Sequence, residues 1–436
     1  MLELDDIQGL VFSGYARQPF ARYWFLELAA GGAAWLARLL FRISTSERRE
    51  RRADRRVNVA FSASGLRALG LPEPALATFP RAFLDGMAAP ERAAALGDGG
   101  ENAADHWDFG GARGRVDALL LAYATDPDEL DEESDELEDE FERFGIKAHV
   151  EDAYLPADRR GHFGFLDPRS NPHIRRGFRL RRQDPLERAL PAGEFVLGYR
   201  NTDGHFAEGP RAPLRTSARA LPPLVDARRA VDLGRNGTFV AVRKLAQDVP
   251  GFWRYAAQTG GALWPEAGPR AATRLAEHLV GRTLDGARLE RCPFGAHARR
   301  ANPRETLGAD PAASLALVQK HRVIRRGRLY GEKLASASEP DGRERGLLFM
   351  ALCADLERQF EFMHGAWLGN PKFGGLTHER DPLVPWAASA GDDADTFSLP
   401  ASPYRRTVPL ERFVRVRGGA YLFMPSLRAL AYLAEG

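Results

Sequence analysis

The chain has 436 residues, of which 44% are apolar and 28% are charged, so its composition is that of a globular protein and excludes a disordered or fibrous one. Its 61 basic and 59 acidic residues leave a net charge of +2, which gives no global field that would attract nucleic acid or an anionic membrane. At roughly 150 residues per domain, the length predicts two or three domains with a substantial core.

The cysteine and N-terminal patterns predict a cytoplasmic protein. Cys292 and Cys353 are too few and too far apart for a disulfide framework, which favours a reducing compartment. The acidic N-terminus lacks the basic-then-apolar order of a signal peptide. The most apolar early stretch, residues 24–41, contains Glu27 and Arg38, so a buried strand and helix are predicted there instead of a membrane span.

The first half of the chain alternates predicted strands with predicted helices. Apolar runs predict strands at residues 57–61, 116–124 and 146–150. Asp126 followed by Pro127 supplies a capping residue and a first-turn proline, so a helix is predicted to carry the acidic run 128–140. That run lacks the glycine turn of a calcium loop, and a solvated helix face is therefore favoured over a calcium site.

The second half repeats this rhythm. Strands are predicted at residues 237–242, 346–353, 413–416 and 421–424, and helices at 249–258, 356–367 and after Pro425. Residues from about 175 to 235 are rich in Arg, Pro and Gly and are weakly periodic, which indicates a long connection. The predicted fold class is α+β, with two halves that are each a mainly antiparallel sheet with helices packed on one face.

Three segments have a composition that suits a binding or catalytic site. Gly161–Pro172 places Asp167 in a turn rich in glycine and aromatic residues, where the acid either stabilises the turn or transfers protons. Cys292–Arg304 places His297 beside several arginines, which suits an anionic ligand. His321–Gly331 is a basic strand that ends in a glycine turn, although arginine clusters carry less weight in a chain whose basic residues are nearly all arginine.

Other motifs point less clearly to chemistry. Glu361 and His364 have the Glu-x-x-His spacing of a carboxylate-bridged di-iron site, but such a site needs two of these motifs and the sequence has one. Two polar positions on an amphipathic helix are therefore the favoured interpretation. The sequence has no phosphate-binding loop, no Gly-x-Ser-x-Gly elbow and no His-Glu-x-x-His motif.

Taken together, these segments resemble the dye-decolorising peroxidases, over nearly the whole chain. The matching blocks come in the family's order, and they include residues 5–9, 193–199, 236–239, 243–248, 357–362, 370–375 and 413–430. The resemblance implies two tandem ferredoxin-like halves that enclose haem. It places the distal acid in an N-terminal half, residues 1–174, and the haem ligand and distal arginine in a C-terminal half, residues 236–436, with residues 175–235 as the long connection.

The resemblance assigns roles to four residues. The segment around His297 is similar to the family's proximal motif, so His297 would be the axial ligand of the haem iron. Arg304 matches an arginine that pairs with a haem propionate, and such charge-assisted bonds contribute about 1.5–3 kcal/mol each. Asp167 falls on the acid of the family's distal Gly-x-x-Asp-Gly motif, and Arg325 falls on its distal arginine.

These roles imply a haem-dependent peroxidase that reduces hydrogen peroxide through a ferryl intermediate and oxidises dyes or phenolic donors. Asp167 would carry the peroxide proton, and Arg325 would stabilise charge on the leaving oxygen. The haem b is expected to be non-covalent because the chain has no Cys-x-x-Cys-His motif. The carboxylate that polarises the haem ligand is not identified by the sequence, and Asp355 and Glu357 are the two candidates.

The distal motif departs from the family pattern at one position. Pro168 follows the acid, where the family has glycine. Proline fixes φ near −65° and has no N–H, so the loop must run differently if the family's glycine uses a positive φ. The alternative function is therefore a haem-binding relative, such as a sensor or carrier, with weak or redirected activity. No nucleic-acid or membrane partner is expected for either function.

Overall fold

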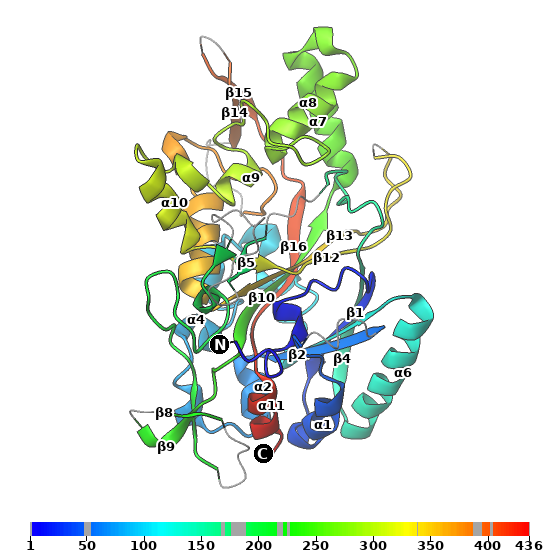
Figure 1. The fold of residues 1–436 in the computed structure, drawn as a ribbon. Helices are drawn as coiled ribbons and strands as arrows, with labels where there is room; N and C mark the ends of the chain where they lie inside the picture. The colour runs from blue at the N-terminus through cyan, green and yellow to red at the C-terminus, as the bar shows by residue number, and fades with distance from the viewer. Residues whose placement is uncertain are drawn as a thin grey trace.

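One large antiparallel sheet with helices on its outer face organises the protein (Figure 1). The computed structural model describes residues 2–47, 54–166, 171–175, 189–215, 221–224, 227–337, 339–386, 395–401 and 404–435. The strand order within the sheet confirms the predicted α+β class with two ferredoxin-like halves.

The first half contributes four strands. They are β1 (Phe20–Glu27), β2 (Arg55–Phe61), β3 (Ala118–Ala124) and β4 (Lys147–Tyr154). Helix α1 (Gly32–Leu39) connects β1 to β2, and helix α6 (Pro127–Phe144) connects β3 to β4. The strands lie in the order β2-β3-β1-β4, and every neighbouring pair is antiparallel. This is the β-α-β-β-α-β arrangement of a ferredoxin-like unit.

The second half repeats this arrangement. Its strands are β10 (Thr238–Gln247), β11 (Ile324–Arg325), β12 (Arg328–Tyr330), β13 (Gly346–Cys353) and β16 (Val414–Met424). The short strands β11 and β12 lie end to end along one edge of β13, while β10 lies along the other edge. β16 lies beside β10 and completes an order that matches that of the first half.

The two halves join along two seams. Each seam is one residue pair long: Phe423 of β16 lies opposite Phe61 of β2, and Leu329 of β12 lies opposite Tyr154 of β4. Because β10 also pairs with β13, the two four-stranded units close on each other as a single barrel-like sheet.

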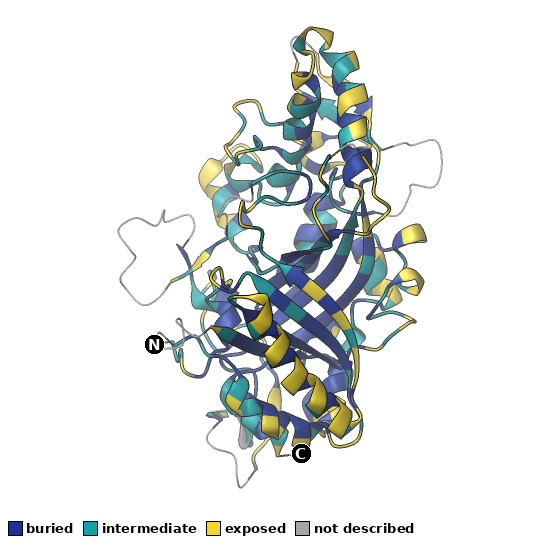
Figure 2. Cartoon of the chain, turned by 90° about the vertical axis from the view of Figure 1, so that its right-hand side faces the viewer, coloured by how far each residue is buried: buried dark blue, intermediate teal, exposed yellow. Residues whose placement is uncertain are grey.

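Because successive side chains of a strand point to opposite faces of the sheet, they pack into two separate cores. Tyr23 and Phe25 of β1 face a cluster inside the closed sheet, whereas Trp24 and Leu26 face a cluster under the helices. Figure 2 shows the strands as a continuous buried layer and the exposed residues mainly on helices and loops. Both faces of the central strands are therefore covered, which explains why a strand such as β3 is apolar at every position, whereas β4 has exposed residues.

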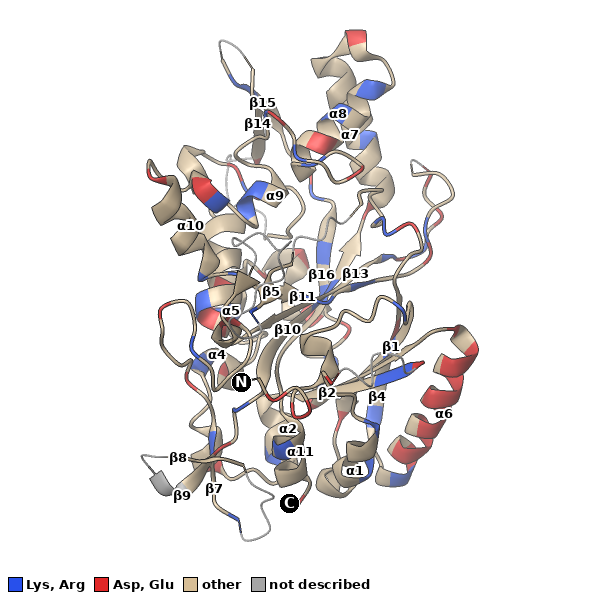
Figure 3. Ribbon diagram, viewed as in Figure 1, with Lys and Arg blue, Asp and Glu red and all other residues tan. Residues whose placement is uncertain are grey.

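Helix α6 carries the acidic run as a solvated face, as predicted. Asp126 caps its first turn by accepting a hydrogen bond from the Glu129 N–H, and Gly145 ends it in a left-handed conformation. Its carboxylates pair with arginines of β1, α1 and β2 and with Arg42, including Arg38 to Glu140 and Arg42 to Glu133 (Figure 3). These pairs attach the helix to the sheet and leave its outer face acidic.

The predicted helix over residues 356–367 forms, but it is wound more widely than an α-helix. It consists of two π-helical turns, η10 (Leu356–Glu361) and η11 (Met363–Leu368). Such turns are rare and occur frequently at functional sites. The other longer helices of this half are α7 (Val249–Leu263) and α8 (Arg270–Val280), which form a projecting hairpin (Figure 1).

The remaining elements are short. The other α-helices are α2 (Ala63–Ala68), α3 (Glu73–Leu76), α4 (Arg81–Asp85), α5 (Pro90–Leu96), α9 (His297–Arg300), α10 (Pro311–Gln319) and α11 (Leu427–Ala434). The other strands are β5 (His173–Ile174), β6 (Ala189–Leu190), β7 (Arg211–Pro213), β8 (Pro223–Leu224), β9 (Ala227–Asp232), β14 (Thr396–Leu399) and β15 (Arg406–Pro409). Strands β6 to β9 lie in the long connection: β6 pairs with β5, which directly precedes the connection, and β7, β8 and β9 form a second small sheet. Across the described ranges, the helices are too short or too polar to cross a membrane.

Candidate functional site

His297 and Asp381 form a hydrogen-bonded pair in the second half. His297 is the first residue of helix α9, and its Nδ1 lies 3.0 and 3.1 Å from the two carboxylate oxygens of Asp381. The carboxylate also accepts hydrogen bonds from the N–H groups of Leu383 (2.8 Å) and Val384 (3.0 Å), and its side chain is fully buried. With its proton on Nδ1 donated to Asp381, a neutral imidazole carries its lone pair on Nε2, the atom that would bind a metal.

The two sequence candidates for this carboxylate are not the partners of His297. Asp355 instead caps η10 by accepting a hydrogen bond from the Arg358 N–H at 2.8 Å. Glu357 pairs with Arg92 at 3.0 Å. Asp381 was missed because it lies 84 positions after His297 in a segment without periodic apolar residues, so only the tertiary structure brings the two together.

Arg300 fixes helix α9 to the rest of this half. It is completely buried, and its guanidinium donates hydrogen bonds to main-chain carbonyls only. The acceptors are the carbonyl oxygens of Gly295, Trp367, Leu368, Asn370 and Glu379, at 2.8 to 3.3 Å. Burial lowers the pKa of Arg300, while the nearby carboxylates of Asp381 and Glu379 act in the opposite direction. Arg300 therefore sets the position of α9 relative to η11 and to the segment that carries Asp381.

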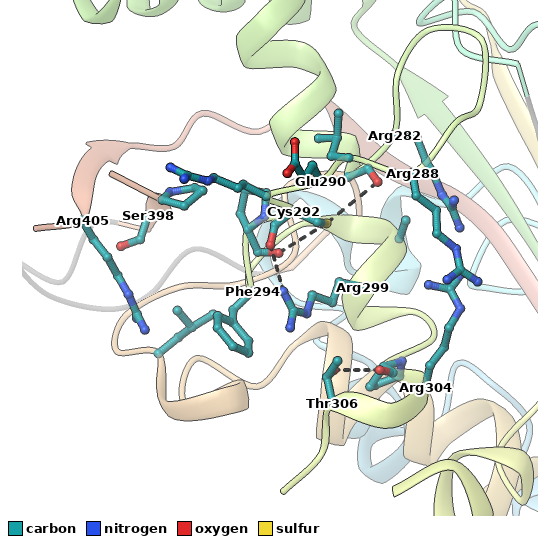
Figure 4. A pocket seen from close by; sticks show the side chains of 18 of the residues that line it. Arg282, Arg288, Glu290, Cys292, Phe294, Arg299, Arg304, Thr306, Ser398 and Arg405 are labelled. Carbon is teal, nitrogen blue, oxygen red and sulfur yellow. Dashed lines mark hydrogen bonds between the residues drawn. The ribbon is translucent and has the colours of Figure 1, made fainter. Parts of the chain in front are cut away.

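Arg304 lies one turn beyond α9, at the start of the 3-10 helix η9 (Arg304–Thr306). Its backbone adopts φ of 54°, which is unusual for a residue with a side chain. Ser314 holds this conformation: its hydroxyl donates to the Arg304 carbonyl at 2.6 Å and accepts from the Leu307 N–H at 2.8 Å. The Arg304 guanidinium lines a cavity of about 550 Å³ (Figure 4).

Arg325 lies in β11, opposite Ala351 of β13. On its other side, Asn171 binds the Arg325 main chain with both atoms of its amide, at 3.0 Å each. Asp167, the predicted distal acid, and Pro168, the proline that follows it, lie outside the described residues. The chain before them is placed by Leu166, whose N–H donates to the Leu284 carbonyl at 2.9 Å.

Glu361 and His364, the Glu-x-x-His pair, take part in separate contacts. Glu361 accepts hydrogen bonds from the Tyr421 hydroxyl and from Arg92, at 2.8 Å each. His364 is buried beside Arg243, and this neighbour and burial lower its pKa well below the usual value. In the part of the chain that the structure describes, no group of three or more His, Cys, Asp and Glu side chains could hold a metal ion.

Comparison with known proteins gives one consistent result. No family model matches the sequence. A dye-decolorizing peroxidase of Mycetinis scorodonius is 26% identical to this chain, over 98% of this chain and 87% of the relative. The solved structure of an ancestral D-type dye decolorizing peroxidase is also 26% identical and superposes with a TM-score of 0.76, covering 99% of this chain and 98% of that one. Over nearly its whole length, the chain is therefore similar to dye-decolorizing peroxidases in sequence and in fold.

A more distant structure agrees with this fold. A DyP-type peroxidase of Anabaena sp. superposes with a TM-score of 0.77 at 20% identity, over 99% of this chain and 94% of that one. In the present chain, the His297–Asp381 pair and Arg325 come from the second half: His297 lies between β10 and β11, Arg325 lies on β11, and Asp381 lies between β13 and β16. Two connections and one strand of a single ferredoxin-like unit thus supply the pair and the arginine.

Proposed function

We propose that this dye-decolorizing peroxidase relative is a haem enzyme that reduces hydrogen peroxide and oxidises dyes or phenolic donors. The observation that carries the proposal is the hydrogen bond between His297 and the buried carboxylate of Asp381. Metal-binding histidines characteristically donate their second ring N–H to a carboxylate or carbonyl, which fixes the ring and makes the ligand nitrogen more basic. The family relationship supplies the class of reaction.

The residues around His297 fit a non-covalent haem b. His297, held by Asp381, would bind the iron through Nε2, and Arg304, seven residues later in the chain, would pair with a propionate. When bound, haem supplies the redox chemistry that the amino acids of this chain cannot supply themselves. Arg300 would keep the ligand oriented, because it fixes α9 to three neighbouring segments.

Arg325 and Asp167 would act on the peroxide. The fixed positive charge of Arg325 would stabilise negative charge that develops on the departing oxygen. Asp167 would take the proton from one peroxide oxygen and return it to the other. Asn171 supports this assignment because it couples the end of the Gly161–Pro172 segment to the main chain of Arg325.

Phenols and dyes are the proposed electron donors. One solved structure to which this chain is similar, at 24% identity and a TM-score of 0.76, is a dye-decolorizing peroxidase in complex with 2,6-dimethoxyphenol. We also propose the division into halves at residues 1–174 and 236–436, joined by residues 175–235. The free thiols of Cys292 and Cys353 are compatible with a cytoplasmic location.

The proposal is tested by reconstituting the purified chain with haem. The wild type is expected to show a Soret band and to decolorise an anthraquinone dye only when peroxide is added. His297→Ala should lose the band. Arg325→Leu should keep the band but decolorise the dye about 100-fold more slowly, as expected for the loss of a group that stabilises transition-state charge. The neighbouring variant Arg322→Leu should keep both the band and the wild-type rate. Absence of haem uptake by the wild type would contradict the proposal.

The alternative function, haem binding with weak or redirected activity, rests on Pro168, which stands where the family has glycine. A Soret band that does not change on rapid mixing with peroxide would favour this alternative. The variant Pro168→Gly restores the family motif and isolates the effect of the proline. A gain of peroxide reactivity in Pro168→Gly would show that the proline limits turnover, whereas equal turnover in both proteins would exclude this role of Pro168.

A further inference from the structure

Trp386 anchors the end of the segment that carries Asp381. The N–H of Asp381 itself donates to the Leu368 carbonyl at 2.9 Å. The N–H groups of Leu383 and Val384 donate to the Asp381 carboxylate. Five residues after Asp381, the indole ring of Trp386 packs between two glycines that belong to other segments. The carboxylate therefore lies between a main-chain contact on one side and a packed ring on the other.

The two glycines form a slot for the indole ring. A Cβ atom at Gly97, the residue that ends α5, would overlap Cε3 of Trp386. A Cβ atom at Gly369, the residue that ends η11, would overlap Cζ2 of Trp386 on the other side. Carbon atoms that are not bonded to each other stay at least about 3.5 Å apart. Any side chain at either glycine would therefore displace the ring.

Gly369 is needed for this contact and not for its backbone conformation. Its φ of −90° and ψ of −9° are angles that most residues adopt in type I turns. Gly97 differs, since its φ of 70° favours glycine whatever lies nearby. The three atoms nearest to a Cβ at Gly369 all belong to Trp386. The fit of the Trp386 ring thus explains why position 369 has no side chain.

Packing holds the ring in this slot. The indole N–H of Trp386 is buried and has no acceptor among the described residues. The buried ring of His364 is a further neighbour, with its centroid 5.3 Å from that of Trp386. His364 Nε2 lies 3.3 Å from the guanidinium of Arg243 on β10. That guanidinium pairs with the buried carboxylate of Asp98, which follows Gly97 in the chain. The slot is therefore fixed to the large sheet.

The end of η11 is a common base for both partners of the proposed haem-ligand pair. Arg300 of α9 donates to the Leu368 carbonyl at 3.3 Å, and α9 begins with His297. Asp381 donates to the same carbonyl, and Trp386 packs on the residue that follows it. Because only the Asp381 segment depends on the ring, a shift of the ring would move the carboxylate relative to the imidazole.

We propose that Trp386 is a positioning residue, whose fit against Gly369 sets the distance and angle between the Asp381 carboxylate and His297. The inference rests on the proposed function in one respect, because the pair can act on a haem iron only when haem is bound. A well-placed carboxylate makes the ligand nitrogen more basic. A displaced carboxylate should therefore weaken haem binding and the iron–histidine bond. The geometric part of the inference concerns the protein without haem.

The variant Gly369→Ala tests the proposal with a single methyl group. It leaves Trp386, Asp381 and His297 in the chain and adds no backbone strain. Titration of the apoprotein with haem should show binding about three- to tenfold weaker, below the roughly 10- to 100-fold typical for loss of the partner itself. Resonance Raman spectroscopy of the ferrous haem complex should show the iron–histidine stretch at a lower frequency than in the wild type. A merely structural role of Gly369 would leave this frequency unchanged.

Gly418→Ala is the matched control. Gly418 lies in β16, and its Cβ would lie 2.7 Å from the ring of Phe109, which belongs to the core inside the closed sheet. This variant also forces an aromatic ring to move, so it should lower stability but keep the wild-type haem affinity and iron–histidine frequency. An equal change in both variants would overturn the proposal, as would a wild-type frequency in Gly369→Ala.

A double variant tests whether Gly369 acts through the ring. Trp386→Ala should also weaken haem binding, because it removes the anchor. Adding Gly369→Ala to it should cause no further loss, since the ring that the methyl group would meet is gone. Additive losses would show that the two residues act independently, and they would overturn the proposal.

Hydrogen exchange in the apoprotein separates this inference from the proposed function. The amide protons of Leu383 and Val384, which bind the Asp381 carboxylate, should exchange faster in Gly369→Ala than in the wild type. The Gly251 amide, bound by the cap of α7, should keep its wild-type rate. If the wild type takes up no haem but the two amides respond, the proposed function is wrong and the positioning role stands. If haem binds but neither the amides nor the iron–histidine stretch respond, the positioning role is wrong and the proposed function stands.

Discussion

The side-chain amide of Asn171 binds the main chain of Arg325 at both its N–H and its carbonyl, with two hydrogen bonds of 3.0 Å. Strand β11 has two residues and pairs with β13 on one edge only, so the Asn171 amide takes the place of a neighbouring strand on the other. The backbone that carries the proposed distal arginine is thereby held on both sides. The contact also ties this strand to the segment that contains Asp167.

Asn171→Ala should impair turnover more than it impairs folding. The loss of two partly buried hydrogen bonds is expected to lower the free energy of unfolding by about 1–3 kcal/mol. Dye decolorisation should fall several-fold with normal haem content, because Arg325 loses one of its supports. Asn201→Ala is the control: the Asn201 side chain also makes two hydrogen bonds to the main chain, but it accepts both, from the N–H groups of Asp203 and His205, and it lies in a surface turn. Equal turnover in the two variants would contradict the positioning role of Asn171.

Asp381→Asn should weaken haem binding without unfolding the protein. The amide oxygen can still accept from the N–H groups of Leu383 and Val384, but the negative charge behind His297 is lost. Loss of such a partner typically lowers metal affinity by about 10- to 100-fold. The measurement is a titration of the apoprotein with haem, followed at the Soret band. Asp355→Asn is the control, and a larger loss of affinity in this control than in Asp381→Asn would show that the carboxylate is wrongly assigned.

Arg300→Met should destabilise the protein strongly. The substitution leaves carbonyl groups of Gly295, Trp367 and Glu379 without their buried donor, and the expected loss is about 3–5 kcal/mol in the free energy of unfolding. Arg299→Met, one residue earlier on the same helix, removes a single hydrogen bond to a carbonyl and should cost less than about 1.5 kcal/mol. Urea unfolding of both variants measures the difference, and similar midpoints would contradict the role assigned to Arg300.

His162 should make the protein less stable in weak acid. Its Nε2–H donates to the Tyr330 carbonyl at 2.9 Å, and burial, aided by the positive charges of Arg345 and Lys333, lowers its pKa to about 4. The unfolded chain takes up a proton below about pH 6.5, whereas the folded chain does so only near pH 4. The free energy of unfolding therefore falls as pH drops through this window, by about 2 kcal/mol at pH 5 from this residue.

The variant His162→Gln isolates this contribution. Gln can still donate to the Tyr330 carbonyl but does not titrate, so the change in unfolding free energy between pH 7 and pH 5 should be smaller than in the wild type. His364, whose pKa is also lowered by burial, keeps part of the acid sensitivity in the variant. The exposed residue His205 provides the control substitution. An undiminished pH dependence in His162→Gln would show that His162 is not buried in its neutral form.

Local patterns in the sequence predicted the sheet because hydrophobic alternation and helix caps act over a few residues. Asp126 and Pro127 mark the start of the acidic helix α6 in the sequence, and the structure begins the helix there. The segment 356–367 was predicted as a helix, but its π-helical winding was not, since periodicity does not distinguish the two at this length. The small sheets formed by β5 to β9 lack periodic runs, and they depend on contacts distant in sequence.

The site residues could be predicted only where a motif within one continuous segment identifies them. His297 and Arg325 lie in segments that match a family pattern, so the sequence alone was enough to single them out. Asp381 has no such local signal. Arg299 and Arg300 are identical neighbours, and nothing in the sequence tells that one lines a cavity while the other is buried beneath the helix. The distinction depends on where α9 packs, which is a property of the tertiary structure.

The two seams of the sheet follow one rule. In each, the fourth strand of one half meets the second strand of the other: β4 beside β12, and β16 beside β2. A two-fold axis between identical units would produce this reciprocal pairing. The monomer is thus built like a symmetric dimer whose two subunits are joined in one polypeptide. His297, Asp381 and Arg325 belong to the second copy, while Asn171, which holds the Arg325 main chain, precedes the long connection, so the proposed site draws on both copies even though only the first carries an acidic helix like α6.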